Sequence, residues 1–284
     1  MKNTTTKTTI ERVLSIMEKV DGRKLINEGI DIDYDNLTVA YNPSHQENVD
    51  TSIENNPTVS NEYGEGIKVY SLLQRKGSSP MDGNPLLYAF KGERGWSFNT
   101  ENDRAAILEQ VDAIAQKFAN MHPLGFTVLI PSGNHLNRMI GDIIKGKGSN
   151  VLVVDDVLTR ITTEEVMDIV MEKGSPFHIA YRNNMDAALR QLRTYLDEMD
   201  KERSGYFTRH FVRDSRMRDI LTNTLKLTSD AVARYSKSID GKDVLLIDDS
   251  ISRGQTIKEA CGILLENYEP NSVTVLTLFS KLYK

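Results

Sequence analysis

The chain has 284 residues, a formal net charge of −5 and one cysteine. This length allows a substantial hydrophobic core, either as one large domain or as a core with an appendage. The acidic balance argues against nonspecific binding to nucleic acid or to an anionic membrane, because either would need a dominant basic field; local basic patches are still compatible with it.

Cysteine usage and hydropathy predict the compartment. The single cysteine, Cys261, excludes an internal disulfide framework and suits a reducing environment. No segment approaches the ~20 consecutive apolar residues of a membrane helix, and residues 1–9 lack a hydrophobic signal region. We therefore expect a cytoplasmic protein with no membrane partner.

Residues 1–66 are expected to form an N-terminal extension. Apolar side chains recur at helical spacing over residues 10–20 and stop at Asp21 and Gly22, which predicts a short amphipathic helix. Residues 42–66 are rich in Asn, Ser, Pro and Glu, and this composition predicts a long loop or arm.

Two strands and a helix are predicted after this extension. Alternating side chains over residues 67–73 predict a half-buried strand. Residues 85–91 follow a turn-like segment at 82–84, and we expect them to form a second strand that pairs with the first. Residues 102–119 carry their apolar side chains on one helical face and predict an amphipathic helix.

A strand, a loop and a helix follow in close succession. Residues 126–130 predict the first core strand, residues 131–135 form the loop, and an amphipathic helix runs through Ile144. Backbone N–H groups in such a loop can hold an anion, but an ordinary connection between a strand and a helix has the same pattern.

Residues 151–154 are apolar and precede two carboxylates, Asp155 and Asp156. We interpret them as a buried strand followed by a helix with a capping box at Thr162. Ile161 stands where a phosphate loop would need glycine, and its β-branched side chain disfavours unusual backbone angles and close approach of phosphate. Phosphate binding is therefore not expected here, whereas a hydroxyl-binding or metal-binding role of the carboxylates stays open.

A helical insertion is predicted at about residues 157–205. Within it, residues 184–199 carry an apolar helical stripe that favours packing in a core or against a partner. Residues 206–213 follow, with further arginines at 216 and 218. By composition alone, a solvated basic segment and a functional loop explain this stretch equally well.

The most informative pattern lies near the C-terminus. Residues 244–247 are large and apolar, typical of a strand buried on both faces, and Asp248 and Asp249 follow directly. Ligands of open α/β sheets bind at that end of a strand. A loop rich in Ser, Gly and Thr comes next, and we expect Thr256 to cap the following helix together with Glu259.

The charges of this pattern indicate its ligand. Backbone N–H groups of residues 252–256, at a helix N-terminus, can hold a phosphate, and Gly254 allows a close approach. Asp248 and Asp249 would repel an adjacent phosphate, so we expect them to accept hydrogen bonds from neutral hydroxyls such as a ribose diol. These features predict a ribose 5-phosphate site; the alternative is a Rossmann-like sheet in which the two carboxylates only cap a turn.

The pattern of four apolar residues, two aspartates, four residues and Gly-x-Thr resembles the phosphoribosyl pyrophosphate (PRPP) motif of type I phosphoribosyltransferases. The stretch from Asp248 to Thr256 is especially similar to that of glutamine amidophosphoribosyltransferases. The Arg-x-Phe of residues 209–211 and the Leu-Lys-Leu of residues 225–227 resemble the flexible catalytic loop and a later element of the same family. The resemblance covers about residues 67–284.

This resemblance implies a fold and its division. We expect an α/β protein with a type I phosphoribosyltransferase-like, Rossmann-like parallel sheet flanked by helices. Residues 67–284 would form the core, including the helical insertion. Residues 1–66 would serve as a hood or partner arm, and specificity for the acceptor would lie in a hood formed by residues 1–100.

The resemblance also implies the residues of the site. The 5-phosphate would be bound by Ser252, Arg253, Gly254, Gln255 and Thr256. The diphosphate would be bound by Ser132, Gly133 and Asn134. The catalytic residues would be Asp248, Asp249 and Arg209. The implied cofactor is Mg²⁺, associated indirectly with Asp248 and Asp249 through ribose hydroxyls or water.

The expected activity follows from this site. Amidotransferases need an N-terminal nucleophilic cysteine for their glutaminase domain, whereas Lys2 follows Met1 here. We therefore expect a shorter, free-standing, Mg²⁺-dependent phosphoribosyltransferase, similar also to competence-associated phosphoribosyltransferase-like proteins, that transfers phosphoribosyl from PRPP to a nucleobase or amine.

The alternative is a non-catalytic PRPP-binding or nucleotide-binding regulator, or an effector subunit of a larger assembly. The expected partners are PRPP and an unidentified small-molecule acceptor. A nucleic acid partner is not expected, because of the net charge. A homodimer or a partner protein stays open.

Overall fold

The computed structural model describes residues 28–45, 48–60, 67–75, 84–122, 125–148, 151–203, 205–251 and 254–281. The chain divides into two compact units: residues 1–58, 72–114 and 281–284 form unit 1, and residues 59–71 and 115–280 form unit 2. This division differs from the predicted boundary between residues 66 and 67, and the hood or arm role of the extension stays a prediction. The helix predicted at residues 10–20 lies outside the described residues.

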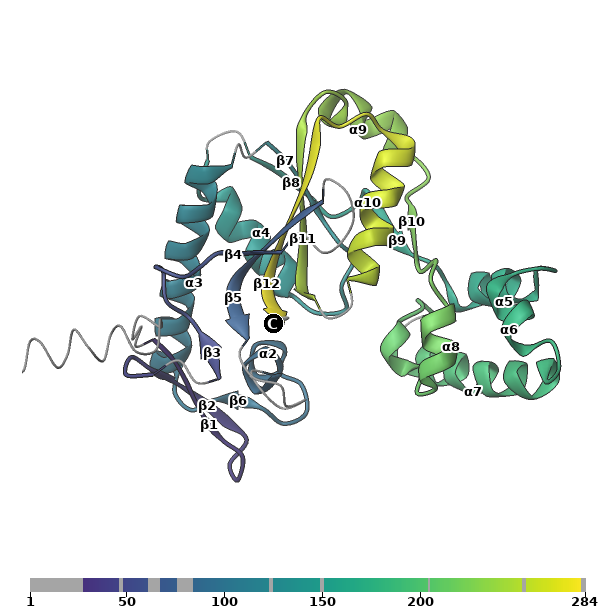
Figure 1. The fold of residues 1–284 in the computed structure, drawn as a ribbon, viewed down its shortest axis with the longest axis horizontal. Helices are drawn as coiled ribbons and strands as arrows, with labels where there is room; N and C mark the ends of the chain where they lie inside the picture. Colours follow the sequence, from purple (N-terminus) through teal and green to yellow (C-terminus); the bar gives the residue numbers. More distant parts are fainter. Residues whose placement is uncertain are drawn as a thin grey trace, which may run out of the picture. The chain divides into compact units, whose positions relative to one another are not determined.

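Unit 1 contains a small sheet (Figure 1). β1 (Gly29–Asp33) and β2 (Thr38–Asn42) form an antiparallel hairpin, and β6 (Ser97–Phe98) pairs in parallel with β2. The strands bury alternate apolar side chains, such as Ile30 and Val39. The predicted helix at residues 102–119 is confirmed as α3 (Glu101–Met121).

The strand predicted at residues 85–91 is wrong, because these residues lie in α2 (Asn84–Lys91). Leu86, Ala89 and Phe90 are buried, at the spacing of three and four that one helical face requires. A short apolar run fits both the helical and the strand period. Tertiary packing therefore decides whether these residues form a helix or a strand. The Phe90 ring meets the Phe98 ring edge-on, with centroids 5.0 Å apart.

The long loop predicted at residues 42–66 contains two short strands in its described part, β3 (Val49–Asp50) and β4 (Thr58–Ser60). Polar residues there form hydrogen bonds to one another. The buried Asp50 accepts hydrogen bonds from the Ser52 hydroxyl at 2.6 Å and from Asn55 Nδ2 at 2.7 Å. Because these polar groups provide one another's hydrogen-bond partners, a polar sequence can be buried here.

Unit 2 contains a mainly parallel sheet. Its strands follow the order β5 (Lys68–Arg75), β12 (Ser272–Lys281), β11 (Asp243–Ile251), β7 (Phe126–Leu129) and β8 (Leu152–Val154), and β4 pairs with β5. β12, β11, β7 and β8 are parallel. β5 confirms the strand predicted at residues 67–73.

Helices cover both faces of this sheet (Figure 1). Val244 and Leu246 of β11 pack in one core cluster with α9 (Ala231–Ile239) and α10 (Gln255–Asn267). On the other face, α4 (Leu136–Lys145) packs so closely that a Cβ on Gly141 would lie 3.0 Å from side-chain atoms of Leu129 and Val153. The fold is thus α/β with parallel strands flanked by helices, which confirms the predicted fold class. No helix within the described ranges is both long and apolar enough to cross a membrane.

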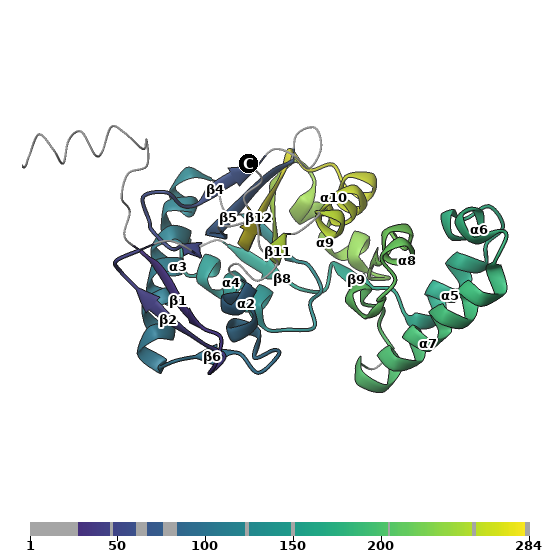
Figure 2. The same cartoon turned by 60° about the horizontal axis from the view of Figure 1, so that its bottom comes forward.

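A second, two-stranded sheet carries a group of helices. β9 (Leu158–Arg160) and β10 (Leu225–Leu227) are antiparallel. The chain between them, residues 161–224, is called the helical lobe. It contains α5 (Thr163–Met171), α6 (Pro176–Tyr181), α7 (Met185–Arg203), the 3-10 helix η1 (Arg209–Phe211) and α8 (Ser215–Ile220), which Figure 2 shows packed together.

The helical lobe has its own hydrophobic core, separate from that of the sheet. Phe177 and Phe207 are its largest fully buried side chains. The predicted capping box is confirmed: Glu165 N–H donates to the Thr162 hydroxyl at 3.2 Å, and Thr162 N–H donates to the Glu165 carboxylate at 2.8 Å. The short hydrogen-bonded ribbon therefore joins two locally packed regions.

Candidate functional site

The two adjacent carboxylates lie near the C-terminal end of β11. The strand runs from Asp243 to Ile251, longer than the predicted residues 244–247, so Asp248 and Asp249 are part of it. Ile247 pairs with Leu129 of β7, after which β7 ends. The loop that follows β7 therefore begins beside the two aspartates, at the edge where parallel sheets place their ligands.

Asp249 is buried and held by hydrogen-bond donors. Asn134 Nδ2 donates to Asp249 Oδ2 at 2.8 Å, and the Ser250 hydroxyl donates to Oδ1 at 2.8 Å. The Ser132 hydroxyl lies 3.5 Å from Oδ2. Two segments predicted separately, residues 132–134 and the aspartate pair, are thus in direct contact.

Asp248 is half-buried and less well satisfied than Asp249. It accepts a hydrogen bond from the Asp249 N–H at 2.9 Å, and Asn137 Nδ2 lies 3.4 Å from its Oδ1. Burial, and after it the negative charge of Asp249, raises the pKa of Asp248 to about 7; the positive charge of Arg160 acts in the opposite direction. Asp248 thus titrates near neutral pH.

The first turn of α10 provides an anion-binding geometry. Gly254, the residue before the helix, has φ +70° and ψ 7°, a left-handed conformation that favours glycine. The N–H groups of a first helical turn have no partner within the helix and point towards a bound anion. Ser252 and Arg253, which complete the predicted phosphate loop, lie outside the described residues.

The predicted capping box of this helix is wrong. The helix begins at Gln255, one residue before the expected cap Thr256. Glu259 accepts instead from the Leu225 N–H at 2.6 Å, the Thr224 hydroxyl at 3.0 Å and the Thr224 N–H. The Glu259 carboxylate therefore binds donors that are distant in sequence, instead of capping its own helix.

A cavity of about 570 Å³ brings several of the predicted residues together. Such a volume lies within the range of about 300–1,000 Å³ typical of small-molecule sites. β11 and α10 supply Asp248, Ser250, Ile251, Gly254, Gln255, Thr256 and Ile257. The helical lobe supplies Arg209, Arg218 and Asp219.

Arg209 reaches this cavity from η1. Its Nε donates to the Leu221 carbonyl at 2.8 Å and its Nη2 to the Thr222 carbonyl at 3.0 Å. Burial lowers the pKa of Arg209, and the nearby Glu259 carboxylate opposes that shift. The basic segment is thus anchored to the lobe rather than merely solvated.

Several residues of the site were missed by the sequence analysis. Asn137 is 3% exposed on the apolar face of α4, and its Nδ2 also donates to the Ile130 carbonyl at 2.6 Å. A polar residue among apolar helix positions was the available signal. Arg160 and Asp219 gave no such signal, because their positions near the cavity depend on contacts distant in sequence. The sequence identifies Arg218 only as part of the basic segment and Glu259 only as a capping residue.

The second aspartate pair has a different environment. Asp155 forms an ion pair with Arg138, and Asp156 forms one with Arg234. The strand before them is less buried than predicted, with Leu152 of β8 49% exposed. Among the described residues, no group of three or more His, Cys, Asp or Glu side chains is arranged to hold a metal ion.

Comparison with known proteins gives one partial match, to a protein-family model. The α/β fold is consistent with the type I phosphoribosyltransferase fold, and a family model described as Phosphoribosyl transferase domain matches residues 187–284. The match includes Arg209, Asp248 and Gly254 and supports phosphoribosyl transfer from PRPP in general terms. No curated protein and no solved structure matches the chain.

Proposed function

We propose that this protein transfers the 5-phosphoribosyl group of PRPP to a nitrogen nucleophile, a nucleobase or an amine, and releases diphosphate. The observation that carries the proposal is the single cavity lined by Asp248, Arg209 and the first turn of α10. It combines an acceptor for sugar hydroxyls, a cation for a leaving anion and backbone donors for a phosphate.

The 5-phosphate is assigned to the N-terminus of α10. The left-handed Gly254 lets the chain turn into the helix, and the N–H groups of Gln255 and Thr256 belong to its first turn. Ser252 and Arg253 are proposed to complete this loop. The positive end of the helix dipole adds to the attraction for a dianion.

The ribose is assigned to the aspartate pair. Asn134 and Ser250 fix the orientation of the Asp249 carboxylate, so it is preorganised to accept from hydroxyls. Asp248 lies on the cavity wall with a raised pKa, because burial and Asp249 disfavour its charge. Hydroxyl donors of the sugar would offset that cost by hydrogen bonding to the charged form.

The leaving diphosphate is assigned to residues 132–134 and Arg209. The loop contacts Asp249, so an anion held there would lie next to the ribose site. A guanidinium has five N–H donors, so two bonds to carbonyls leave Arg209 able to bind an anion as well. Positive charge that meets the diphosphate as it departs lowers the barrier.

The cofactor assigned to this site is Mg²⁺. Asp248 and Asp249 present the hard oxygen donors that this ion prefers, and they fit indirect contact through ribose hydroxyls or water. When bound, Mg²⁺ would neutralise charge on the diphosphate. The form of the motif between Asp248 and Thr256 favours an amidophosphoribosyltransferase-like or competence-associated type, so amines and nucleobases are the acceptors to test first.

Calorimetric titration of PRPP with and without Mg²⁺ tests the proposal, on the wild type and on Asp248→Asn with Asp249→Asn. We expect Mg²⁺-sensitive binding that the double variant loses while its circular dichroism spectrum is unchanged. Diphosphate release with a panel of amines and bases then measures transfer. Binding without any release would favour the non-catalytic regulator, and equal binding by a folded double variant would remove the carboxylates from the site.

A further inference from the structure

Residues 221–225 end the helical lobe and lead into β10, and two charged side chains hold them from different directions. The carbonyls of Leu221 and Thr222 accept from Arg209, at 2.8 Å and 3.0 Å. The N–H groups of Thr224 and Leu225 donate to Glu259 of α10. A single short segment thus connects the lobe arginine of the cavity with the helix that begins at the cavity.

The Glu259 carboxylate makes an unusual set of contacts for a helical side chain. It accepts from two consecutive backbone N–H groups and from the Thr224 hydroxyl at 3.0 Å. Burial raises the pKa of Glu259, whereas these hydrogen bonds and the charge of Arg209 favour its ionised form. Hydrogen bonds to a charged group are stronger than those between neutral groups, so this contact attaches the segment firmly to α10, while the pairing of Leu225 with Arg160 attaches it to β9.

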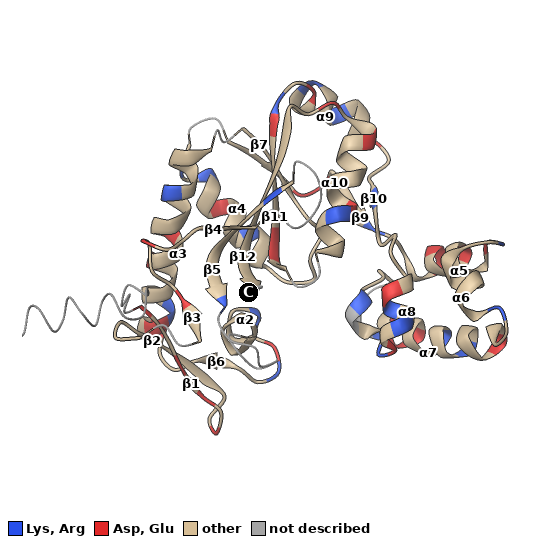
Figure 3. Ribbon diagram, in the orientation of Figure 1, with Lys and Arg blue, Asp and Glu red and all other residues tan. Residues whose placement is uncertain are grey.

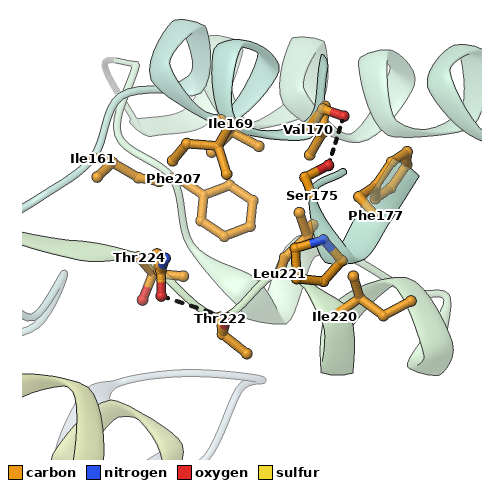
Figure 4. A pocket seen from close by; sticks show the side chains of 13 residues that line it. Ile161, Ile169, Val170, Ser175, Phe177, Phe207, Ile220, Leu221, Thr222 and Thr224 are labelled. Atoms are coloured by element: carbon orange, nitrogen blue, oxygen red, sulfur yellow. Dashed lines mark hydrogen bonds between the residues drawn. The ribbon is translucent and has the colours of Figure 1, made fainter. Parts of the chain in front are cut away.

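Packing on the lobe side of the segment is incomplete, although Leu221 belongs to the lobe core. A cavity of about 50 Å³ lies there, lined by Leu221, Thr222, Asn223 and Thr224 together with apolar lobe residues that include Phe207 (Figure 4). Atoms that face a void lose dispersion contacts on that side. The polar contacts therefore fix the segment together with the packing of Leu221 and Leu225.

We infer that Glu259 is a positioning residue, which fixes residues 221–225 to α10 and thereby sets the place of Arg209 relative to the phosphate-binding turn. Glu259 lies one helical turn beyond that turn and needs no contact with substrate. The consequence for ligand binding rests on the proposed function, whereas the attachment itself rests only on the contacts within this chain.

Glu259→Met in the full chain tests this inference, because methionine keeps the length of the side chain but has no oxygen to accept from the Thr224 and Leu225 N–H groups. We expect exchange of the Thr224 and Leu225 amide hydrogens to rise about tenfold or more, as two hydrogen bonds are lost. Affinity for inorganic diphosphate with Mg²⁺ should fall about tenfold, and affinity for ribose 5-phosphate should stay within about twofold, because only the diphosphate uses Arg209.

The control is Glu266→Met, the same substitution at an exposed position of the same helix, which should change neither exchange nor binding. If Glu259→Met fails to fold, Thr224→Val removes only the hydroxyl contact and should weaken diphosphate binding in the same direction. Unchanged amide exchange, or equal weakening of both ligands, overturns the inference. If the wild type binds neither ligand, the proposed function fails, and exchange alone then decides whether Glu259 fixes the segment.

Discussion

Asp248 and Asp249 are neighbours in sequence with different surroundings. Asp249 is buried among donors from two segments, Asn134 and Ser250. Asp248 has fewer donors, and burial next to a second carboxylate raises its pKa to about 7. Asp248 thus changes charge near neutral pH.

This difference predicts a pH-dependent effect of Asp248→Asn on stability. The pKa of about 7 in the folded chain lies above the ordinary value of 3.8, so the folded state binds this proton more tightly than the unfolded state. The carboxyl therefore lowers stability progressively as pH rises between about 4 and about 7. We expect Asp248→Asn to stabilise the protein by about 1–2 kcal/mol at pH 8 and by much less at pH 4.5.

Thermal unfolding at the two pH values measures this effect. Asp155→Asn, at the other aspartate pair, is the control, because its carboxylate is largely exposed and paired with Arg138. The same change in melting temperature at both pH values for Asp248→Asn would contradict the pKa assignment.

Gly254 and Gly262 offer a matched pair of glycine substitutions around one helix. Gly254 has φ +70°, so Gly254→Ala should destabilise the protein by about 1–2 kcal/mol and weaken ribose 5-phosphate binding. A Cβ on Gly262 meets nothing within 4 Å, so Gly262→Ala should stabilise α10 by about 0.5–1 kcal/mol without changing binding. Urea unfolding and calorimetry measure both; equal effects of the two substitutions would contradict the strained turn.

At the scale of elements, the helical lobe depends on local contacts where it leaves β9. The capping box of Thr162 and Glu165 begins α5, and Lys226 of β10 forms an ion pair with the same Glu165. The first helix of the lobe is therefore tied to the ribbon that carries it.

Removal of the cap should loosen α5 without affecting the sheet. We expect Thr162→Ala to cost about 1 kcal/mol and to speed amide exchange in α5, because an orphan N–H loses its acceptor. Thr162→Ser keeps the hydroxyl and should behave like the wild type. Amide hydrogen exchange measured separately for α5 and β11 tests this prediction. Equal acceleration in both elements would contradict a local effect of the Thr162 cap on α5.

Long, regular sequence patterns predicted their secondary structure correctly, whereas a short pattern did not. The helix at residues 102–119 and the strand at 244–247 have sustained patterns, and the structure contains both. The short segment 85–91 was assigned the wrong element. Its neighbours in the fold, such as Phe98, decide between helix and strand, and they are not visible in the local pattern.

At the scale of the molecule, two hydrophobic cores share unit 2. The sheet core and the lobe core are separate clusters, and the ribbon of β9 and β10 joins them. Acidic and basic residues alternate over α7 and α8 (Figure 3), so these lobe helices carry no field of a single sign.

Excision of the lobe tests how far the sheet folds without it. Ile161 N–H donates to the Thr224 carbonyl at 3.1 Å, so residues 162–223 can be replaced by a two-residue Asn-Gly turn. We expect the shortened chain to unfold cooperatively and to bind ribose 5-phosphate within about threefold of the wild type, but to lose diphosphate binding together with Arg209. Non-cooperative unfolding would show that the sheet needs the lobe.

The sequence by itself determined the features that depend on neighbouring residues. The buried strand before Asp248, the glycine with positive φ at 254 and the capping box at Thr162 follow from side-chain period and local hydrogen bonding. The resemblance to type I phosphoribosyltransferases implied the parallel α/β class, and the structure confirms it. The roles of the predicted site residues stay a proposal.

Only the tertiary structure decided which distant residues meet. Glu259 bonds to Thr224 and Leu225 rather than to its own helix, and Asn134 reaches Asp249. Each contact joins residues far apart in the chain, so its geometry depends on how helices and strands pack. Packing is a property of the whole core, and no local pattern contains it.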